Sequence, residues 1–151
     1  MTRNLFEGKN VLVVGGNSGI GLAAAKAFSQ EGANLIITGR NVETLTSKAD
    51  EIGGRTSAYQ CDVTDMEQIK DLVVKVELEF GYIKVLFISA GQNSSGSINS
   101  VTEENWDSVI QVNEKMVFFL SQAFAKQLIK QGEGGKIINV CSMLSYQGGI
   151  R

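Results

Sequence analysis

Short apolar runs alternate with longer segments of helical periodicity along the whole chain. The runs are rich in β-branched residues and stop at glycines or polar residues, which is typical of buried strands. Five of them are expected to form strands, at residues 10–14, 34–38, 57–61, 84–89 and 136–141.

The segments between these runs have helical character. Residues 20–30 are rich in alanine, and residues 42–52 end at a glycine pair. Thr64 is expected to begin a third helix, with Glu67 completing a capping box, and Thr102 a longer fourth helix. The side chains expected to be buried recur at helical spacing. They are Met66, Ile69, Leu72, Val73, Val76 and Phe80, then Trp106, Val109, Ile110, Val117, Leu120 and Phe124.

Strands that alternate with helices predict an α/β fold. Right-handed crossovers place helices on both faces of a parallel sheet, so we expect a doubly wound, Rossmann-type sheet with strand order 3-2-1-4-5. The chain has no internal repeat or linker, and residues 1–151 are expected to form a single domain. Residues 92–100 are expected to form a loop at the carboxyl end of the fourth strand.

Composition narrows the range of partners. The chain is 43% hydrophobic and carries a net charge of -2 with its 14 Lys and Arg residues scattered, which argues against nucleic-acid binding. No stretch has the length of a signal peptide or a membrane span, so we expect no membrane partner and a cytoplasmic location.

The chain contains no histidine. This excludes a Ser-His-Asp triad, a histidine general base and the common His-containing zinc sites, and no metal site is expected. Cys61 and Cys141 each end a strand run, where a small buried thiol is the ordinary interpretation. In the expected strand order they lie at opposite edges of the sheet, too far apart for a disulfide.

Glycines mark the turn between the first strand and the first helix. Gly15, Gly19 and Gly21 form a GxxxGxG pattern, whose missing side chains let the backbone approach a pyrophosphate at the helix N-terminus. The same expected site includes Asn17, Ser18 and Ile20. No Lys-Ser/Thr pair follows Gly21, so a P-loop is disfavoured, and a tight turn without a ligand is the structural alternative.

The ends of the second and third strands carry the residues expected to select the cofactor. NAD sites usually hold an acidic residue after the second strand, but Gly39 and Arg40 stand here. Arg40 suits the 2′-phosphate of NADP, or is an unpaired arginine at a helix start. Asp62 can accept a hydrogen bond from the adenine amino group while Val63 packs near the ring; alternatively, Asp62 serves the dipole of the next helix.

Two further polar residues are expected near this site. Asn113 falls on the apolar stripe of the long helix, so its amide either bonds a neighbouring backbone carbonyl or orders a site at the carboxyl edge of the sheet. Ser142 leaves the fifth strand at that edge, where open α/β sheets bind ligands, although a turn-forming serine is the alternative.

Together these motifs resemble the short-chain dehydrogenase/reductase family over residues 9–151. The family's TGxxxGxG turn matches residues 14–21 with Val14 in the threonine place, its aspartate before the third helix matches Asp62, and its NNAG segment matches residues 88–91. The resemblance implies that Ala90 and Gly91 contact the cofactor and that Asn113 and Ser142 are catalytic. Residues 134–151, together with the long helix before them, resemble more particularly the family's sugar-acid 5-dehydrogenases, which act on 2-dehydro-3-deoxygluconate or gluconate.

The resemblance implies an oxidoreductase that prefers NADP(H), with NAD as the alternative cofactor. Hydride would pass between the nicotinamide and a secondary alcohol or ketone, a sugar acid by the finer resemblance. Ser142 would hydrogen-bond the reacting oxygen, and Asn113 would help to hold a water of the proton relay. Family members are often dimers or tetramers, so a homo-oligomer is expected of the full-length form.

The sequence departs from the family pattern at Val14 and at Ile88 and Ser89, which replace polar residues. The family's YxxxK motif would fall just past Arg151, and none of the three tyrosines has a lysine four positions on. We therefore expect residues 1–151 to form a single dinucleotide-binding domain that is truncated after the fifth strand, with little turnover alone. The alternative is a nucleotide-binding or interaction module without catalysis, and a methyltransferase is disfavoured because Arg40 replaces the acidic residue such a site would hold.

Overall fold

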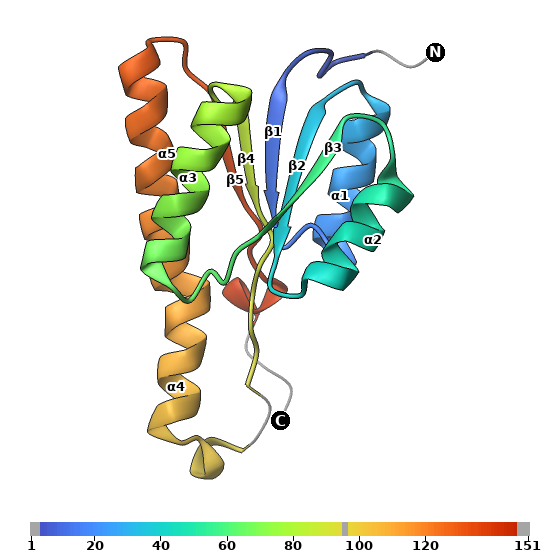
Figure 1. Ribbon diagram of the computed structural model, residues 1–151. Helices are drawn as coiled ribbons and strands as arrows, with labels where there is room; N and C mark the ends of the chain where they lie inside the picture. Colours follow the sequence, from blue (N-terminus) through green and yellow to red (C-terminus); the bar gives the residue numbers. More distant parts are fainter. Residues whose placement is uncertain (1–3, 95–96, 148–151) are drawn as a thin grey trace.

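A computed structural model describes residues 4–94 and 97–147. Within these ranges five parallel strands form one sheet in the order β3-β2-β1-β4-β5 (Figure 1). The strands are β1 (Asn10–Val14), β2 (Asn34–Gly39), β3 (Thr56–Gln60), β4 (Val85–Ile88) and β5 (Lys136–Asn139). The predicted α/β class and strand order are confirmed, with some strand ends displaced by one or two residues.

Helices cover both faces of the sheet, as Figure 1 shows. They are α1 (Gly19–Gln30) and α2 (Val42–Ile52) on one face, and α3 (Met66–Phe80) and α5 (Val117–Gln131) on the other. Because successive strand residues point to opposite faces, β1 supplies both cores. Val11 and Val13 pack on the side of α1 and α2, whereas Leu12 and Val14 pack on the side of α3 and α5.

The N-terminus of α3 differs from the prediction. Asp65 is the cap, because its Oδ1 accepts hydrogen bonds from the backbone N of Glu67 and of Gln68 at 2.9 and 3.4 Å. Thr64 instead donates its hydroxyl to Asp62 Oδ1 at 2.8 Å. The expected capping box is therefore wrong. The predicted apolar face of α3 is confirmed, with Ile69, Leu72, Val73 and Val76 buried.

The long helix consists of three parts. α4 (Glu103–Ile110) begins at Thr102, whose Oγ1 accepts a hydrogen bond from Asn105 N at 3.2 Å as predicted. A π-helical turn (Gln111–Met116) then joins α4 to α5. Figure 1 shows α4 extending past the carboxyl edge of the sheet.

The predicted apolar stripe of this helix is wrong in its first half. Trp106 is 62% exposed, because α4 lies beyond the sheet. The π-helical turn has more residues per turn than an α-helix, and Val112 and Met116 become the buried positions. Leu120 and Phe124, which lie over the sheet, are buried as predicted.

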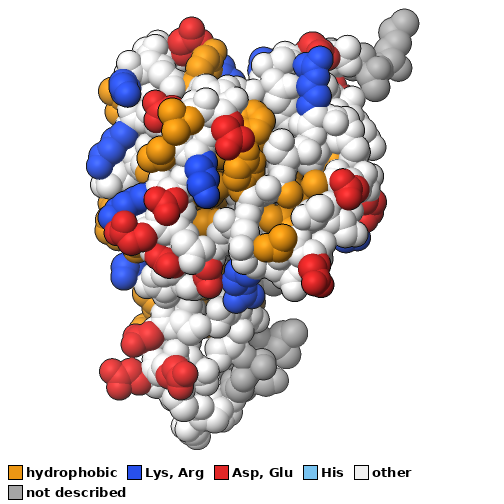
Figure 2. Space-filling view, viewed as in Figure 1, with side chains coloured by type: hydrophobic (Ala, Val, Ile, Leu, Met, Phe, Trp, Pro, Cys, Tyr) orange, Lys and Arg blue, Asp and Glu red, His pale blue; other side chains and the backbone are white. Residues whose placement is uncertain are grey.

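The segment at 92–100 is a loop as expected, except for a short 3-10 turn at Ile98–Ser100; residues 95 and 96 lie outside the described ranges. Residues 148–151, which are part of the segment that carries the resemblance, also lie outside the described ranges. No helix of the described residues is long and apolar enough to cross a lipid bilayer. Basic and acidic side chains lie interspersed over the helices on the face that Figure 2 shows.

Candidate cofactor and active site

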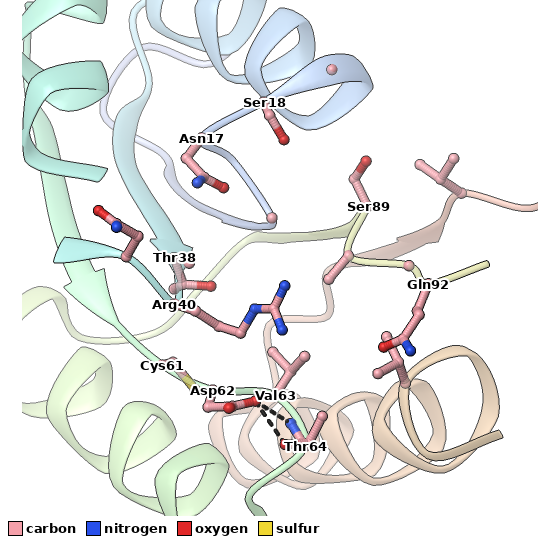
Figure 3. A pocket seen from close by; sticks show the side chains of 18 of the residues that line it. Asn17, Ser18, Thr38, Arg40, Cys61, Asp62, Val63, Thr64, Ser89 and Gln92 are labelled. Carbon is pink, nitrogen blue, oxygen red and sulfur yellow. Dashed lines mark hydrogen bonds between the residues drawn. The ribbon is translucent and has the colours of Figure 1, made fainter. Parts of the chain in front are cut away.

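A cavity of about 680 Å³ opens at the carboxyl edge of the sheet (Figure 3). Its wall comes from the turn after β1, the end of β2, the segment after β3 and the loop after β4. The predicted cofactor residues that line it are Gly15, Asn17, Ser18, Gly19, Ile20, Arg40, Asp62, Val63, Ala90 and Gly91. Of the residues predicted to bind the cofactor, Gly21 alone lies outside this wall. Val112 of the π-helical turn and Val140 after β5 complete the wall, so the fold assembles this site from six separate parts of the chain.

Close packing explains two of the turn glycines. Gly15 has a φ of +79°, and its N–H donates to Thr38 O at 3.0 Å. A Cβ on Gly15 would lie 2.8 Å from the backbone N of Ala90, which leaves no room for a side chain. A Cβ on Gly21 would collide with the carbonyl oxygen of Gly15. Gly21 therefore shapes the turn without contacting the cavity.

The N-terminus of α1 is open to the cavity. Its cap residue Ser18 makes no side-chain capping hydrogen bond, and the first turn holds no acidic residue. Nothing lies within 4 Å of a Cβ placed on Gly19. Since the first N–H groups of a helix have no intrahelical partner, this end can bind an anion such as a pyrophosphate.

Arg40 supplies a positive charge at the other side of the cavity. Figure 3 shows its side chain extending from the end of β2 into the cavity. Among the described ion pairs none involves Arg40. Beside it, a Cβ on Gly39 would lie 3.0 Å from Asn17 Oδ1, so an acidic residue at this position would displace Asn17. Arg40 is therefore available to bind an anionic group in the cavity.

Asp62 forms a local turn and also reaches the cavity. Its Oδ1 accepts hydrogen bonds from Thr64 N at 2.9 Å and from Thr64 Oγ1 at 2.8 Å. Its Oδ2 makes no hydrogen bond to a described residue, and Figure 3 shows the carboxylate at the cavity wall. Because Asp65 caps α3, Asp62 is not needed there and has an acceptor free for a ligand.

The two cysteines differ in environment. Burial, followed by the charges of Asp62 and Asp65, raises the pKa of the Cys61 thiol to about 11, so it stays neutral in the cavity wall beside Val63. Cys141 is exposed, so the prediction that both thiols are buried is wrong for it; it lies just past β5, a strand at the edge of the sheet. Both thiols are free, as predicted.

A second cavity of about 770 Å³ adjoins the first. Asn113 and Ser142 both line it, and the two cavities share residues 89–92 and Val140. The two residues that the resemblance implies to be catalytic therefore line one cavity, which adjoins the first through the loop after β4.

Asn113 lies in the π-helical turn and is exposed, so its expected place on a buried stripe is wrong. Its amide nevertheless has two partners: Oδ1 accepts from Gln92 N at 2.8 Å and Nδ2 donates to Gln92 O at 2.7 Å. Ser142 is also exposed, and its Oγ accepts a hydrogen bond from Leu144 N at 3.1 Å in a 3-10 turn. Both residues thus stabilise local backbone at the edge where the cavities open.

Sequence reasoning missed two residues of the site. Gln92 was expected only as part of a loop, yet it holds Asn113 and donates from Nε2 to Ser108 Oγ at 2.5 Å. Thr38 was expected only as a strand residue, yet it lines the first cavity. For Thr38, the available sequence signal was a polar residue at the end of an otherwise apolar strand. No group of three or more metal-ligating residues occurs in the described part of the chain.

Comparison with known proteins places this site in a family. The sequence profile of the short chain dehydrogenases matches residues 9–151. The chain belongs to this family. A 2-dehydro-3-deoxy-D-gluconate 5-dehydrogenase from Dickeya dadantii is 40% identical over 157 aligned positions, which cover 100% of this chain and 61% of the relative. A 3-oxoacyl-[acyl-carrier-protein] reductase from Thermotoga maritima is also 40% identical, covering 95% of this chain and 59% of the relative.

Solved structures of short chain dehydrogenases share the fold. Actinorhodin polyketide ketoreductase, described with NADPH, superposes with a TM-score of 0.89 at 29% identity, covering 99% of this chain and 58% of that chain. The chain spans about three-fifths of the length of each of these relatives. The predicted resemblance to the family, and to its sugar-acid 5-dehydrogenases, is confirmed.

Proposed function

We propose that this short chain dehydrogenase binds NADP(H) across the two adjoining cavities. The observation that supports this proposal is the free positive charge of Arg40 in one cavity with the α1 N-terminus and Asp62. In this arrangement Arg40 binds the 2′-phosphate, the α1 N-terminus binds the pyrophosphate, and Asp62 accepts from the adenine amino group while Val63 packs on the ring. The nicotinamide end lies toward Asn113 and Ser142.

The reaction proposed for the complete protein is hydride transfer between the cofactor and a secondary alcohol or ketone. The nicotinamide supplies or accepts the hydride when bound. Ser142 Oγ hydrogen-bonds the reacting oxygen, and Asn113 holds a water of the proton relay. We propose a sugar acid as the substrate, because the similar protein from Dickeya dadantii is named as a 2-dehydro-3-deoxy-D-gluconate 5-dehydrogenase.

We also propose that the protein is a cytoplasmic homo-oligomer. Trp106 and Phe118 expose 62% and 60% of their surface along the long helix, which supports self-association.

A second candidate function is nucleotide binding without catalysis by the 151-residue chain. None of its tyrosines is followed by a lysine four positions on, and a positioned acid or base typically contributes about 10²–10⁴-fold to the rate. NADPH-dependent reduction of a ketone by this polypeptide would exclude the second candidate and would establish the first for the chain itself.

The cofactor proposal is tested by calorimetric titration of NADPH and NADH into the chain and two variants. Arg40→Asp removes the proposed phosphate contact and should weaken NADPH binding by about tenfold or more with little effect on NADH. Arg55→Asp is the matched control. Arg55 lies just before β3, at the amino ends of the strands, and does not line the cavity. Equal NADPH affinity in the wild type and Arg40→Asp would refute the assignment of Arg40.

A further inference from the structure

Thr38 has a buried hydroxyl without a partner. The residue follows Leu35, Ile36 and Ile37 in β2, and its side chain is 0% exposed. Its Oγ1 makes no hydrogen bond to any described residue. Folded proteins pair nearly all such groups, because an unpaired buried hydroxyl costs stability. This hydroxyl therefore requires an explanation outside the packing of the core.

The hydroxyl lies in the wall of the first cavity. Thr38 lines that cavity, and Figure 3 shows its oxygen directed toward the interior, beside Arg40. Strand alternation places Thr38 on the same face as Ile36, which packs in the α3-side core with Cys61 and Val63. Both of these residues line the cavity as well. Thr38, in β2, thus lies on the same side of the sheet as Cys61 and Val63, which follow β3.

We infer that the Thr38 hydroxyl, which is fully buried in this structure, is uncovered when a nucleotide enters the cavity beside Arg40, and that it then donates a hydrogen bond to a ring nitrogen of the adenine. The inference rests on the proposed nucleotide binding and adds the means of base recognition. An adenine presents acceptors at its ring nitrogens and a donor at its amino group. The cavity offers the complementary pair, a hydroxyl donor at Thr38 and a free carboxylate oxygen at Asp62. Arg40 acts on the ribose phosphate, so the two contacts are independent.

The test is calorimetric binding of 5′-AMP and 2′,5′-ADP to the 151-residue chain. Thr38→Val keeps the shape of the side chain and removes its hydroxyl. It should weaken both ligands by about fivefold, and it should raise the Tm by about 2 °C because the unpaired hydroxyl is gone. Thr38→Ser retains the hydroxyl and should bind both ligands within about twofold of the wild type.

Ser121→Ala is the matched control. Ser121 Oγ is another buried hydroxyl without a described partner, but Ser121 lies in α5 and outside the first cavity. Its loss should leave 5′-AMP affinity unchanged.

Four outcomes would overturn the inference: equal affinity of Thr38→Val and wild type, an effect confined to 2′,5′-ADP, equal weakening by Thr38→Ser, or a lower Tm in Thr38→Val. The last outcome would mean that the hydroxyl is bonded within the protein. Failure of the wild type to bind either ligand would also overturn the proposed function. About fivefold weaker binding of both ligands by Thr38→Val, with near wild-type binding by Thr38→Ser, is the result that the inference predicts.

Discussion

Asn113 and Gln92 form a two-point contact in which one side-chain amide binds both the N–H and the carbonyl oxygen of the same backbone residue, at 2.8 and 2.7 Å. The contact joins the π-helical turn to the loop after β4, and both residues line the second cavity. It therefore holds together two parts of the wall of the second cavity, where the proposed chemistry takes place.

We expect Asn113→Asp to lose the half of this contact in which Nδ2 donates to Gln92 O, while a carboxylate oxygen can still accept from Gln92 N. A carboxylate cannot donate to Gln92 O and repels it, so the free energy of unfolding should fall by about 1–2 kcal/mol. Urea denaturation measures the change. Asn93→Asp introduces the same charge in the same cavity wall and serves as the control, with a change within about 0.5 kcal/mol. Equal effects of the two variants would show that the charge, not the lost contact, is responsible.

Gly15→Ala should be strongly destabilising. The new Cβ meets Ala90 N at 2.8 Å at a φ of +79°, so strain and overlap together should cost about 3 kcal/mol. Gly8→Ala has a similar φ of +68° but nothing within 4 Å of the Cβ, and should cost about 1 kcal/mol. Chemical denaturation of both variants separates overlap from strain, and similar losses would argue against the close approach of β4 to the turn.

The cap of α3 predicts a dependence on pH. A hydrogen bond from the Gln68 side chain, followed by those from the N–H groups of Glu67 and Gln68, lowers the pKa of Asp65. The ionised carboxylate therefore stabilises the fold above its unfolded-state pKa of about 3.9, and this contribution disappears as the pH falls through the lower folded-state pKa.

Asp65→Ala should accordingly lower the Tm by about 3 °C at neutral pH and by clearly less in acid below both pKa values. Thermal unfolding followed by circular dichroism across this range measures the difference. Thr64→Ala is the comparison, since the Thr64 hydroxyl donates to Asp62 and does not cap α3. A larger loss in Thr64→Ala than in Asp65→Ala would restore the capping box that the structure excludes.

The cysteines should differ in reactivity. At about pH 8 iodoacetamide should modify the exposed Cys141 and leave Cys61, whose burial and pKa of about 11 keep its thiol protonated. Cys61 should become reactive as the pH approaches that pKa or after denaturation. Peptide mass mapping identifies the modified residue, and Cys141→Ser should leave the native protein unlabelled. Labelling of Cys61 in the native state at neutral pH would contradict its environment.

The strand order and most of the cofactor cavity could be predicted because their signals are local. Apolar runs locate strands, and a right-handed crossover then constrains their order. The glycine spacing and the positions of Arg40 and Asp62 at strand ends follow from the same register. The parallel sheet gathers those ends at one edge, so many of the residues that line the first cavity could be predicted from the sequence.

The errors concern features that depend on tertiary structure. Helical periodicity predicted Trp106 and Asn113 on a buried stripe, but α4 leaves the sheet and the π-helical turn interrupts the period. Thr64 and Asp65 are both good caps and adjacent, so composition could not choose between them. Gln92 has no sequence signal, because its role comes from the position of its backbone.

The most direct test of the account is an NMR titration of the ¹⁵N-labelled chain with NADPH. If one dinucleotide spans both cavities, amide signals of Gly15, Arg40 and Val63 should shift together with the side-chain amide of Asn113, at one common dissociation constant. Gly132, at the end of α5, should not move. Shifts restricted to the second cavity, or none at Gly15 and Arg40, would contradict the proposed site.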